Sequence, residues 1–133
     1  MIVVDASFLV MALADDGANG NRARVRLRGE ELAAPHLVDV EVTSVLRRAV
    51  RTGGVTGQRA GQALHDLMDL EIERVPPVTL LDRVWALRAN YTSYDACCVA
   101  LAELFDAPLL TYDAKMAAAS GARCAFEVFT AAG

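Results

Sequence analysis

Short apolar segments alternate with helix-forming segments along this chain, and this alternation limits the possible folds more than any other feature. The apolar segments are short enough for buried strands and lie at residues 2–4, 32–34, 72–75, 108–111 and 124–129. Between them, apolar residues recur with helical spacing at residues 8–13, 37–49, 60–68, 77–87, 94–105 and 114–119. The order predicts an α/β fold, in which helices cover both faces of a short, mostly parallel central sheet.

The size and charge of the chain favour one domain with a localised binding surface. All 133 residues fit a single domain, residues 1–133, and a hydrophobic fraction of 54% supplies ample core material. The formal net charge is -4, so the surface as a whole does not attract nucleic acid. Any contact with nucleic acid is therefore expected to be local.

The cysteines and the N-terminus predict a cytoplasmic protein. Cys97, Cys98 and Cys124 are an odd set that suits neither a disulfide framework nor a zinc site. The first two of them are expected to fill the interior of a helix. Asp5 interrupts the N-terminal apolar run, which also lacks a positive segment, so no export signal is expected. No apolar stretch approaches the roughly 20 residues of a membrane span, so no membrane association is expected.

Residues that favour helix starts predict several boundaries. Ser7, Thr56 and Thr92 precede helical segments and are expected to cap them. Pro77 suits the first turn of a helix. Residues 22–28 alternate arginine with small or apolar residues, which fits a strand and a short helix equally well.

Two acidic residues stand where an α/β fold builds its ligand sites, and two more lie on helices. Asp5 directly follows the first strand and Asp113 follows the fourth, and ligands of such sheets bind beyond the carboxyl ends of the strands. Asp95 lies in the first turn of the helix at 94–105, and Glu41 lies inside an earlier helix. Each acid also has a structural interpretation. The two strand-end acids can cap the helices that follow them. Asp95 can stabilise the dipole of its helix from the first turn, and Glu41 can lie on a solvated helix face.

Several carboxylates that lie together against apolar elements indicate a bound cation. Two unit charges about 4 Å apart repel by roughly 4 kcal/mol at an effective dielectric constant near 20. Oxygen ligands without histidine or thiol suit Mg²⁺ or Mn²⁺, which leave room for phosphate oxygens. Such an ion can activate water and neutralise charge on a phosphate. The four acids therefore predict metal-assisted phosphoryl chemistry.

Four short blocks of sequence carry a family resemblance. They are residues 4–7 (VDAS), residues 35–46 around Glu41, residues 94–96 (YDA) with 99–102 (VALA), and residues 110–113 (LTYD). Together they span nearly the whole chain, which resembles a PIN-domain ribonuclease of the VapC type, the toxin of a bacterial type II toxin–antitoxin system. A departure is Tyr112, which is bulky for the position before the last acid.

The resemblance implies a PIN-like three-layer fold and a metal-dependent endoribonuclease. The four acids would bind Mg²⁺ or Mn²⁺, with Asp5 and Asp95 as the most direct ligands. The hydroxyl groups of Ser7 and Thr111 would support the carboxylates. The resemblance also implies an RNA substrate, a homodimer and a cognate VapB-type antitoxin that blocks the active site.

An arginine row forms a local basic cluster at Arg22, Arg24, Arg26 and Arg28. It could contact RNA phosphates or an acidic segment of an antitoxin. It could equally be a solvated face that balances nearby acids. The sequence leaves both interpretations open.

Two other functions fit parts of the same pattern. A receiver-like phosphoacceptor signalling domain also has acids at strand ends, but it should carry paired acids after the first strand and an acid after a central one. In this chain the strand at 72–75 ends in Pro76 and Pro77. A catalytically silent PIN-like binding module would keep the partner surface without the chemistry, and only a measurement of activity separates it from an enzyme.

Overall fold

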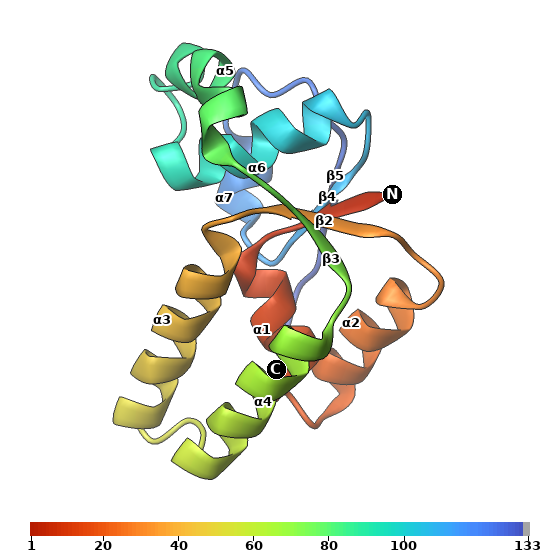
Figure 1. The fold of residues 1–133 in the computed structure, drawn as a ribbon, viewed down its shortest axis with the longest axis vertical. Helices are drawn as coiled ribbons and strands as arrows, with labels where there is room; N and C mark the ends of the chain where they lie inside the picture. The colour runs from red at the N-terminus through yellow and green to blue at the C-terminus, as the bar shows by residue number, and fades with distance from the viewer. Residues whose placement is uncertain (132–133) are drawn as a thin grey trace.

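The central sheet has five strands in the order β3-β2-β1-β4-β5, and every neighbouring pair is parallel. The computed structural model describes residues 1–131. The strands are β1 (Ile2–Val4), β2 (Leu32–Pro35), β3 (Ile72–Val75), β4 (Leu109–Thr111) and β5 (Phe126–Val128) (Figure 1). The predicted α/β class is confirmed, with a fully parallel sheet where a mostly parallel one was predicted. The predicted domain at 1–133 includes residues 132–133, which lie outside the described residues.

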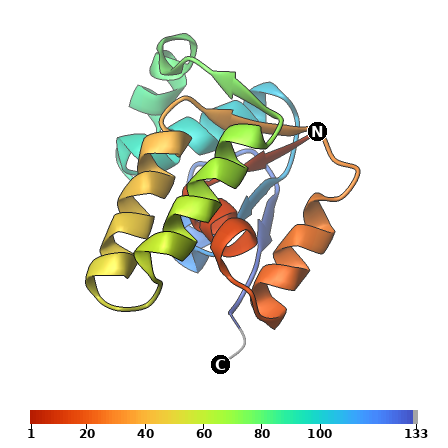
Figure 2. The same ribbon diagram turned by 60° about the horizontal axis from the view of Figure 1, so that its bottom comes forward.

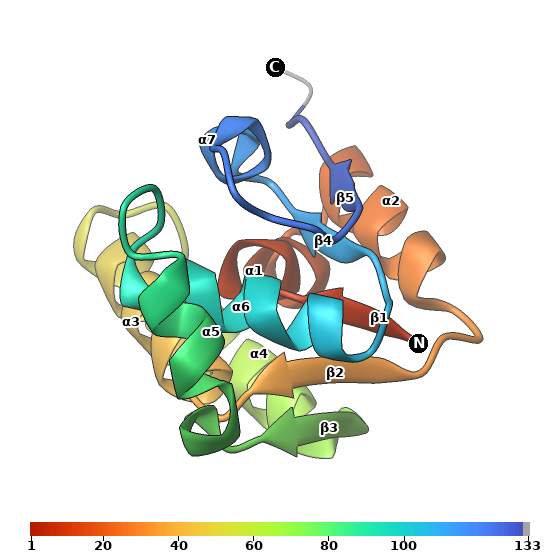
Figure 3. The ribbon, with the colours of Figure 1, turned by 90° about the horizontal axis from the view of Figure 1, so that it is seen from above.

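Helices cover both faces of the sheet. One face carries α1 (Ala6–Ala14), α2 (Ala18–Leu27), α3 (Val38–Arg51) and α4 (Gly57–Asp69). The other carries the 3-10 helix η1 (Pro77–Leu80), α5 (Leu81–Ala86), α6 (Ser93–Leu104) and α7 (Ala114–Ala118). Figure 2 shows α3 and α4 side by side next to α1, and Figure 3 shows α5 alongside α6. The predicted three-layer arrangement is confirmed.

Each inner strand contributes to two separate cores. Successive side chains of a strand point to opposite faces of the sheet. Val3 therefore packs with α5 and α6, while Ile2 and Val4 pack with α1 and α3. In β2, Ala33 joins the first of these cores and its two neighbours join the other. Both faces are apolar, which explains why the strands are continuous apolar runs in the sequence.

Hydroxyl and carboxylate caps define the helix starts. Thr56 accepts the backbone N–H of Arg59 at 3.1 Å, and Thr92 caps α6 in the same way, so both predictions are confirmed. The prediction that Ser7 caps the first helix was wrong. The helix begins at Ala6, and Asp5 is its N-cap. A carboxylate one residue before the helix reaches the free N–H groups of the first turn, whereas Ser7 already lies inside that turn.

Three other boundaries refine the sequence predictions. Residues 22–28, which fitted a strand or a helix, belong to the end of α2 and the residue after it. The last strand covers only the middle of the predicted segment 124–129. The predicted helix at 77–87 divides into η1 and α5. Pro77 occupies the first turn as predicted, and that turn adopts the tighter 3-10 form that is common at helix ends.

Helix α6 is the most buried element on its face of the sheet. All residues from 96 to 102 are buried, and the helix packs against β1, β2 and β4. Cys97 and Cys98 are free thiols inside this stretch, as predicted. Despite its apolar character, α6 has only 12 residues, and no helix within residues 1–131 is long and apolar enough to cross a membrane.

Candidate active site

Four acidic side chains from separate segments line one pocket at the carboxyl ends of the strands. Asp5 follows β1 and Asp113 lies just beyond β4, and these strands are neighbours in the sheet. Asp95 comes from the first turn of α6, and Glu41 from the first turn of α3. The pocket has a volume of about 390 Å³. The fold thus brings together all four acids that the sequence singled out.

Asp5 is the most deeply buried of these acids, with 6% of its surface exposed. Its Oδ1 accepts the backbone N–H of Phe8 at 2.9 Å and the hydroxyl of Ser7 at 2.7 Å, and its Oδ2 accepts the hydroxyl of Thr111. Asp5 therefore caps α1 and lines the pocket with the same carboxylate. An ionised carboxylate offers about four lone-pair positions, so three hydrogen bonds leave about one position for a ligand.

The hydroxyl groups of Ser7 and Thr111 connect Asp5 to the segment that carries Asp113. Each hydroxyl donates to Asp5 and accepts a backbone N–H from the segment after β4. Ser7 accepts from Tyr112 at 3.1 Å, and Thr111 accepts from Asp113 at 2.9 Å. Thr111 is fully buried, so water does not compete for the hydrogen bond between its hydroxyl and Asp5. The two hydroxyls hold the two strand-end acids in a fixed relation to each other.

Asp113 and Asp95 are also oriented by the starts of their helices. Oδ1 of Asp113 accepts the backbone N–H of Lys115 at 2.9 Å and caps α7. The backbone N–H of Asp95 donates to Oγ1 of Thr92 at 3.2 Å. The structural interpretation of Asp5 and Asp113 as caps is thus correct, and it coexists with their place in the pocket.

Burial and mutual repulsion raise the pKa values of three acids in the pocket. Burial raises the pKa of Asp5, its hydrogen bonds oppose the rise, and the charge of Asp113 adds to it. The pKa of Asp95 is raised by burial and then by the charges of Asp113 and Asp5. Burial raises the pKa of Glu41, followed by the charges of Asp95 and Asp5. Within residues 1–131, neither arginine nor lysine contributes to these shifts, so the pocket concentrates negative charge that no side-chain cation offsets.

The donor set of the pocket fits a hard divalent cation. All four side chains offer carboxylate oxygens, the ligands that Mg²⁺ and Mn²⁺ prefer. The carboxylate of Glu41 accepts no hydrogen bond from any described residue, so it can bind a ligand. In the described part of the chain, no three acidic, histidine or cysteine side chains converge on a common point as metal ligands. Without a cation between them, the four carboxylates repel one another, and we expect them to lie apart.

The pocket also has a partly apolar lining that sequence reasoning did not identify. Cys98 lies beneath the acids, and burial followed by their charges raises its pKa, so the thiol stays neutral and is not a nucleophile. Helical spacing could have revealed part of this lining. Cys98 is three residues after Asp95, and Val45 is four residues after Glu41, which places each pair on one helix face. The other apolar lining residues are Val10, Met11, Tyr112 and Met116.

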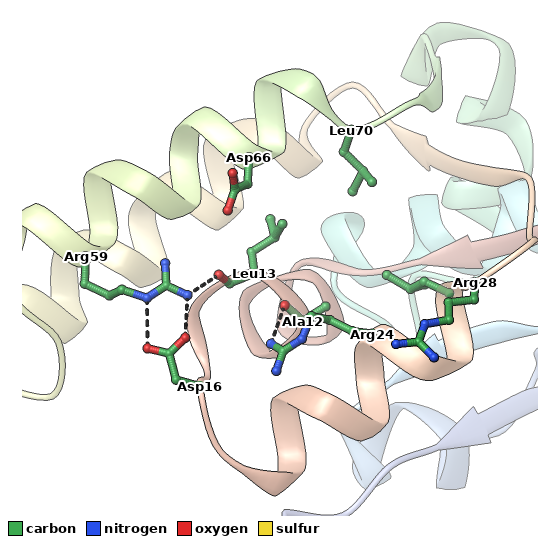
Figure 4. Close-up of a pocket in the computed structure, with 9 residues that line it drawn as sticks. Ala12, Leu13, Asp16, Arg24, Arg28, Arg59, Asp66 and Leu70 are labelled. Atoms are coloured by element: carbon green, nitrogen blue, oxygen red, sulfur yellow. Dashed lines mark hydrogen bonds and ion pairs between the residues drawn. The ribbon is translucent and has the colours of Figure 1, made fainter.

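The arginine row of α2 is largely engaged in contacts within the protein. Arg24 donates to the backbone carbonyl groups of Ala12 and Asp15 at 3.0 and 2.7 Å, and Figure 4 shows the first of these bonds. The other two bonded members are Arg22 and Arg26, whose partners are Asn19, Glu30, Glu127 and Thr130. Arg24 and Arg28 line a separate pocket of about 520 Å³ among α1, α2 and α4 (Figure 4). Contact of this row with RNA or an antitoxin stays a prediction.

Comparison with known proteins places the chain in a family. The family model described as PIN domain matches residues 2–122, a range that includes all four acids. The chain belongs to the PIN domain family. This confirms the resemblance drawn from the four sequence blocks.

Two curated proteins resemble this PIN domain over nearly their whole length. A VapC ribonuclease of Mycobacterium bovis is 42% identical over 131 residues, which cover 96% of this chain and 98% of that protein. Ribonuclease VapC1 of Mycobacterium tuberculosis is 45% identical over 123 residues, which cover 92% of each chain. The crystal structure of PAE2754 from Pyrobaculum aerophilum has a similar fold, with a TM-score of 0.71 and 28% identity over 96% of this chain and 83% of that one.

Membership of the PIN domain family excludes the receiver-like alternative, and the sheet agrees. Receiver domains have the strand order 2-1-3-4-5. The PIN domain described here has β3 at the edge of the sheet beside β2, and β1 between β2 and β4. The residue after β3 is Pro76, so the position that would carry the phosphorylated acid has no carboxylate.

Proposed function

We propose that this PIN domain is a Mg²⁺- or Mn²⁺-dependent endoribonuclease that acts as the toxin of a toxin–antitoxin pair. The observation that carries the proposal is the pocket shared by Asp5, Glu41, Asp95 and Asp113, whose negative charge has no cationic side chain beside it among the described residues. Four carboxylates suit a divalent ion and phosphate chemistry. The similarity to VapC ribonucleases supports RNA as the substrate.

Each acid has its own part in this proposal. Asp5 would be the fixed ligand, because three hydrogen bonds hold it and about one lone-pair position is left. Asp95 and Asp113 would complete the metal-binding set from the opposite face of the sheet. Glu41, which accepts no hydrogen bond, would bind the ion or orient the attacking water. A bound Mg²⁺ or Mn²⁺ would neutralise phosphate charge and lower the pKa of that water.

The partners follow from the same assignment. A cognate VapB-type antitoxin would block the acidic pocket, and the toxin would act as a homodimer of one-domain chains of residues 1–133. The protein would work in the cytoplasm, where its RNA substrate is found and where free thiols such as Cys97 and Cys98 are stable.

Cleavage assays on matched variants test the enzymatic proposal. Purified wild-type protein, Asp5→Asn and the control Asp69→Asn, which changes an exposed acid of α4, are incubated with RNA in Mg²⁺, Mn²⁺ or excess EDTA. We expect wild type and the control to cleave only with a divalent ion, and Asp5→Asn to remain folded but inactive. Full activity of Asp5→Asn, or full activity in EDTA, would refute the proposed mechanism.

Mapping of RNA ends in cells separates the enzyme from the silent binding module. Brief induction of the wild-type protein should create new 5′ ends at defined positions, and Asp5→Asn should not. Identical end patterns for the two proteins, together with inactivity of the purified wild type in both metals, would favour the silent module. A unique set of ends would identify the RNA substrate.

A further inference from the structure

The C-terminal half of α3 carries a group of cations that the fold does not use. Arg47, Arg48 and Arg51 are exposed, and within residues 1–131 their side chains make no hydrogen bond or ion pair. Other arginines of the chain have structural partners, as in the pairs that Arg74 and Arg83 form with carboxylates. We call Arg47, Arg48 and Arg51 the α3 arginines.

The α3 arginines lie in a segment without acidic residues, although the chain as a whole is acidic. Residues 42–65 contain four arginines and no aspartate or glutamate, and the fourth arginine, Arg59, pairs with Asp16. Arg47 and Arg51 are four residues apart on one helix, so their like charges repel. The isolated chain therefore bears a repulsion here that a bound polyanion would relieve.

Stabilisation of the helix dipole does not account for this group. Cations in the last turn of a helix offset the partial negative charge of its C-terminus. Yet α4, which packs against α3 and has 13 residues where α3 has 14, carries no basic residue in its last turn. The dipole of a helix of this length thus does not require three arginines in this fold.

The α3 arginines begin where the lining of the acidic pocket ends. Glu41 and Val45 of α3 both line the pocket. Arg48 comes seven residues after Glu41 and three after Val45, so it lies on the same side of the helix, two turns or about 10 Å beyond Glu41. Figure 1 shows α3 running from the sheet outward, so these turns carry its surface away from the pocket.

We propose that the α3 arginines bind backbone phosphates of the RNA strand next to the bond that the acidic pocket holds. This inference rests on the nuclease function proposed above and names part of its substrate-binding surface. The strand must continue beyond the pocket, where the carboxylates and the net charge of -4 repel its phosphates. Guanidinium groups bind phosphate through paired hydrogen bonds and supply the local positive charge that the strand needs.

The exposed side chains around the α3 arginines fit a nucleic acid better than an acidic protein segment. Protein interfaces depend on large apolar anchors. Between residues 43 and 52, Val50 is the only exposed apolar side chain, and it is just 37% exposed. Ser44 is exposed one turn before Arg48, and a serine hydroxyl is a common donor to phosphate oxygens. A surface of this kind positions a phosphate backbone without reading its sequence.

The salt dependence of RNA binding tests the proposal without cleavage. Asp5→Asn serves as the background, and its binding to a fluorescein-labelled single-stranded RNA of mixed sequence is measured by anisotropy at about 50–200 mM salt. Each phosphate contact on a single strand contributes roughly 0.7 to the slope of log affinity against log salt. Adding Arg48→Gln should reduce that slope by about 0.7, and replacing all three α3 arginines with glutamine should reduce it by about 2.

The affinities themselves should fall in the same order. An exposed ion pair is worth up to roughly a 5-fold change in affinity, so Arg48→Gln should weaken binding about 5-fold at the lowest salt. The triple variant should weaken it on the order of 100-fold. In Mg²⁺ and with Asp5 intact, Arg48→Gln should raise the KM for RNA cleavage by a similar factor and leave kcat nearly unchanged, because the arginine does not touch the reacting atoms.

Two matched variants separate charge at this place from charge in general. Arg48→Lys keeps the charge and loses the planar pair of donors, so it should keep the salt slope of the background protein. Arg28→Gln removes an exposed arginine at the end of α2, and Figure 2 shows α2 and α3 on opposite sides of the helical layer. It should bind RNA like the background protein. Thermal melts check that all variants are folded.

Several results would overturn the inference. One is an unchanged affinity and salt slope in both α3 variants while the background protein binds RNA; a loss in Arg28→Gln would then place the strand along α2. Another is normal RNA cleavage by the α3 variants with loss of antitoxin binding, which would assign the α3 arginines to that partner. Cleavage with a KM that Arg48→Gln does not change refutes this inference alone, whereas a wild type that neither binds nor cleaves RNA also refutes the proposed function.

Discussion

Replacing Thr111 with valine tests whether one buried hydroxyl organises the acidic pocket. The change removes a hydrogen bond to the Asp5 carboxylate and the acceptor of the Asp113 backbone N–H. A hydrogen bond to a charged group contributes about 1.5–3 kcal/mol, and an N–H left without a partner costs about 1–3 kcal/mol. Water can reach the Asp113 N–H in part, so we expect Thr111→Val to lower the free energy of unfolding by about 2–4 kcal/mol at pH 7.5.

Thr111→Ser is the matched control because it keeps the hydroxyl and loses only a methyl group. That loss should cost about 1 kcal/mol. Urea unfolding followed by circular dichroism measures both variants. In thermal unfolding, each kcal/mol of lost unfolding free energy should lower the Tm by about 3–5 °C at this chain length.

The difference between the two variants should depend on pH. The pKa of Asp5 in the folded protein is above its ordinary value of 3.8, and the hydroxyl of Thr111 counteracts this shift. A raised folded pKa means that stability is lost as pH rises from the unfolded pKa through the folded one. Thr111→Val should raise the pKa of Asp5 further. The unfolding free energy of Thr111→Val should therefore fall furthest below that of Thr111→Ser at pH 7.5, and the difference should shrink toward pH 3.8. In Thr111→Val, the rise of the cleavage rate on the acidic side of its pH profile should also move to higher pH.

Two results would refute this reasoning. Equal stability of Thr111→Val and Thr111→Ser at pH 7.5 would show that the hydroxyl contributes nothing to the charged form of Asp5. A deficit that stays constant from pH 7.5 to pH 4 would show that the loss is one of packing and is unrelated to the carboxylate.

Three further predictions concern the acidic pocket and the close contact between Gly20 and Asp15. Asp95→Asn should stabilise the metal-free protein by about 1 kcal/mol at pH 7.5, because it removes a half-buried charge that its neighbours repel. Since its folded pKa is raised, this gain in unfolding free energy should disappear below pH 3.8, and a loss of stability at pH 7.5 would contradict the repulsion. Mg²⁺ should raise the Tm of wild type but not that of Asp5→Asn, and equal shifts in differential scanning fluorimetry would indicate binding elsewhere. Gly20→Ala should lower the free energy of unfolding by about 1–3 kcal/mol or more, because its Cβ would lie 1.9 Å from the carbonyl oxygen of Asp15. Gly61→Ala inside α4, whose Cβ would meet nothing within 4 Å, should not lower the free energy of unfolding in urea.

The sequence was most informative where local position alone determines geometry. Asp5 and Asp113 follow strands that are neighbours in a parallel sheet, so their convergence could be predicted once the strands were identified. Asp95 was placed by the start of a helix. Glu41 depended on the family resemblance, because its approach to the pocket is set by how α3 packs against α1, which no local pattern encodes.

Interactions between distant segments account for what the sequence could not predict. Arg26 looked like a member of a basic binding row, but it pairs with Glu127, which is 101 residues away. Ser7 looked like a helix cap, but its hydroxyl links Asp5 to the backbone of Tyr112 across the sheet. In both cases the residue type was correct for a polar contact, and the partner emerged only from the tertiary fold.

In the segment at 77–87, more apolar side chains recur with helical spacing than the core can bury. The pattern predicted a helix with apolar residues on much of its circumference, and the structure buries Leu80, Val84 and Leu87 but exposes Leu81 and Trp85. The two sets form stripes about 100° apart, and only one stripe of a short helix can face the sheet. The exposed stripe and the crowded carboxylates are both unfavourable in the isolated chain. Such departures from local consistency are expected at functional sites, where binding of a ligand or partner relieves them.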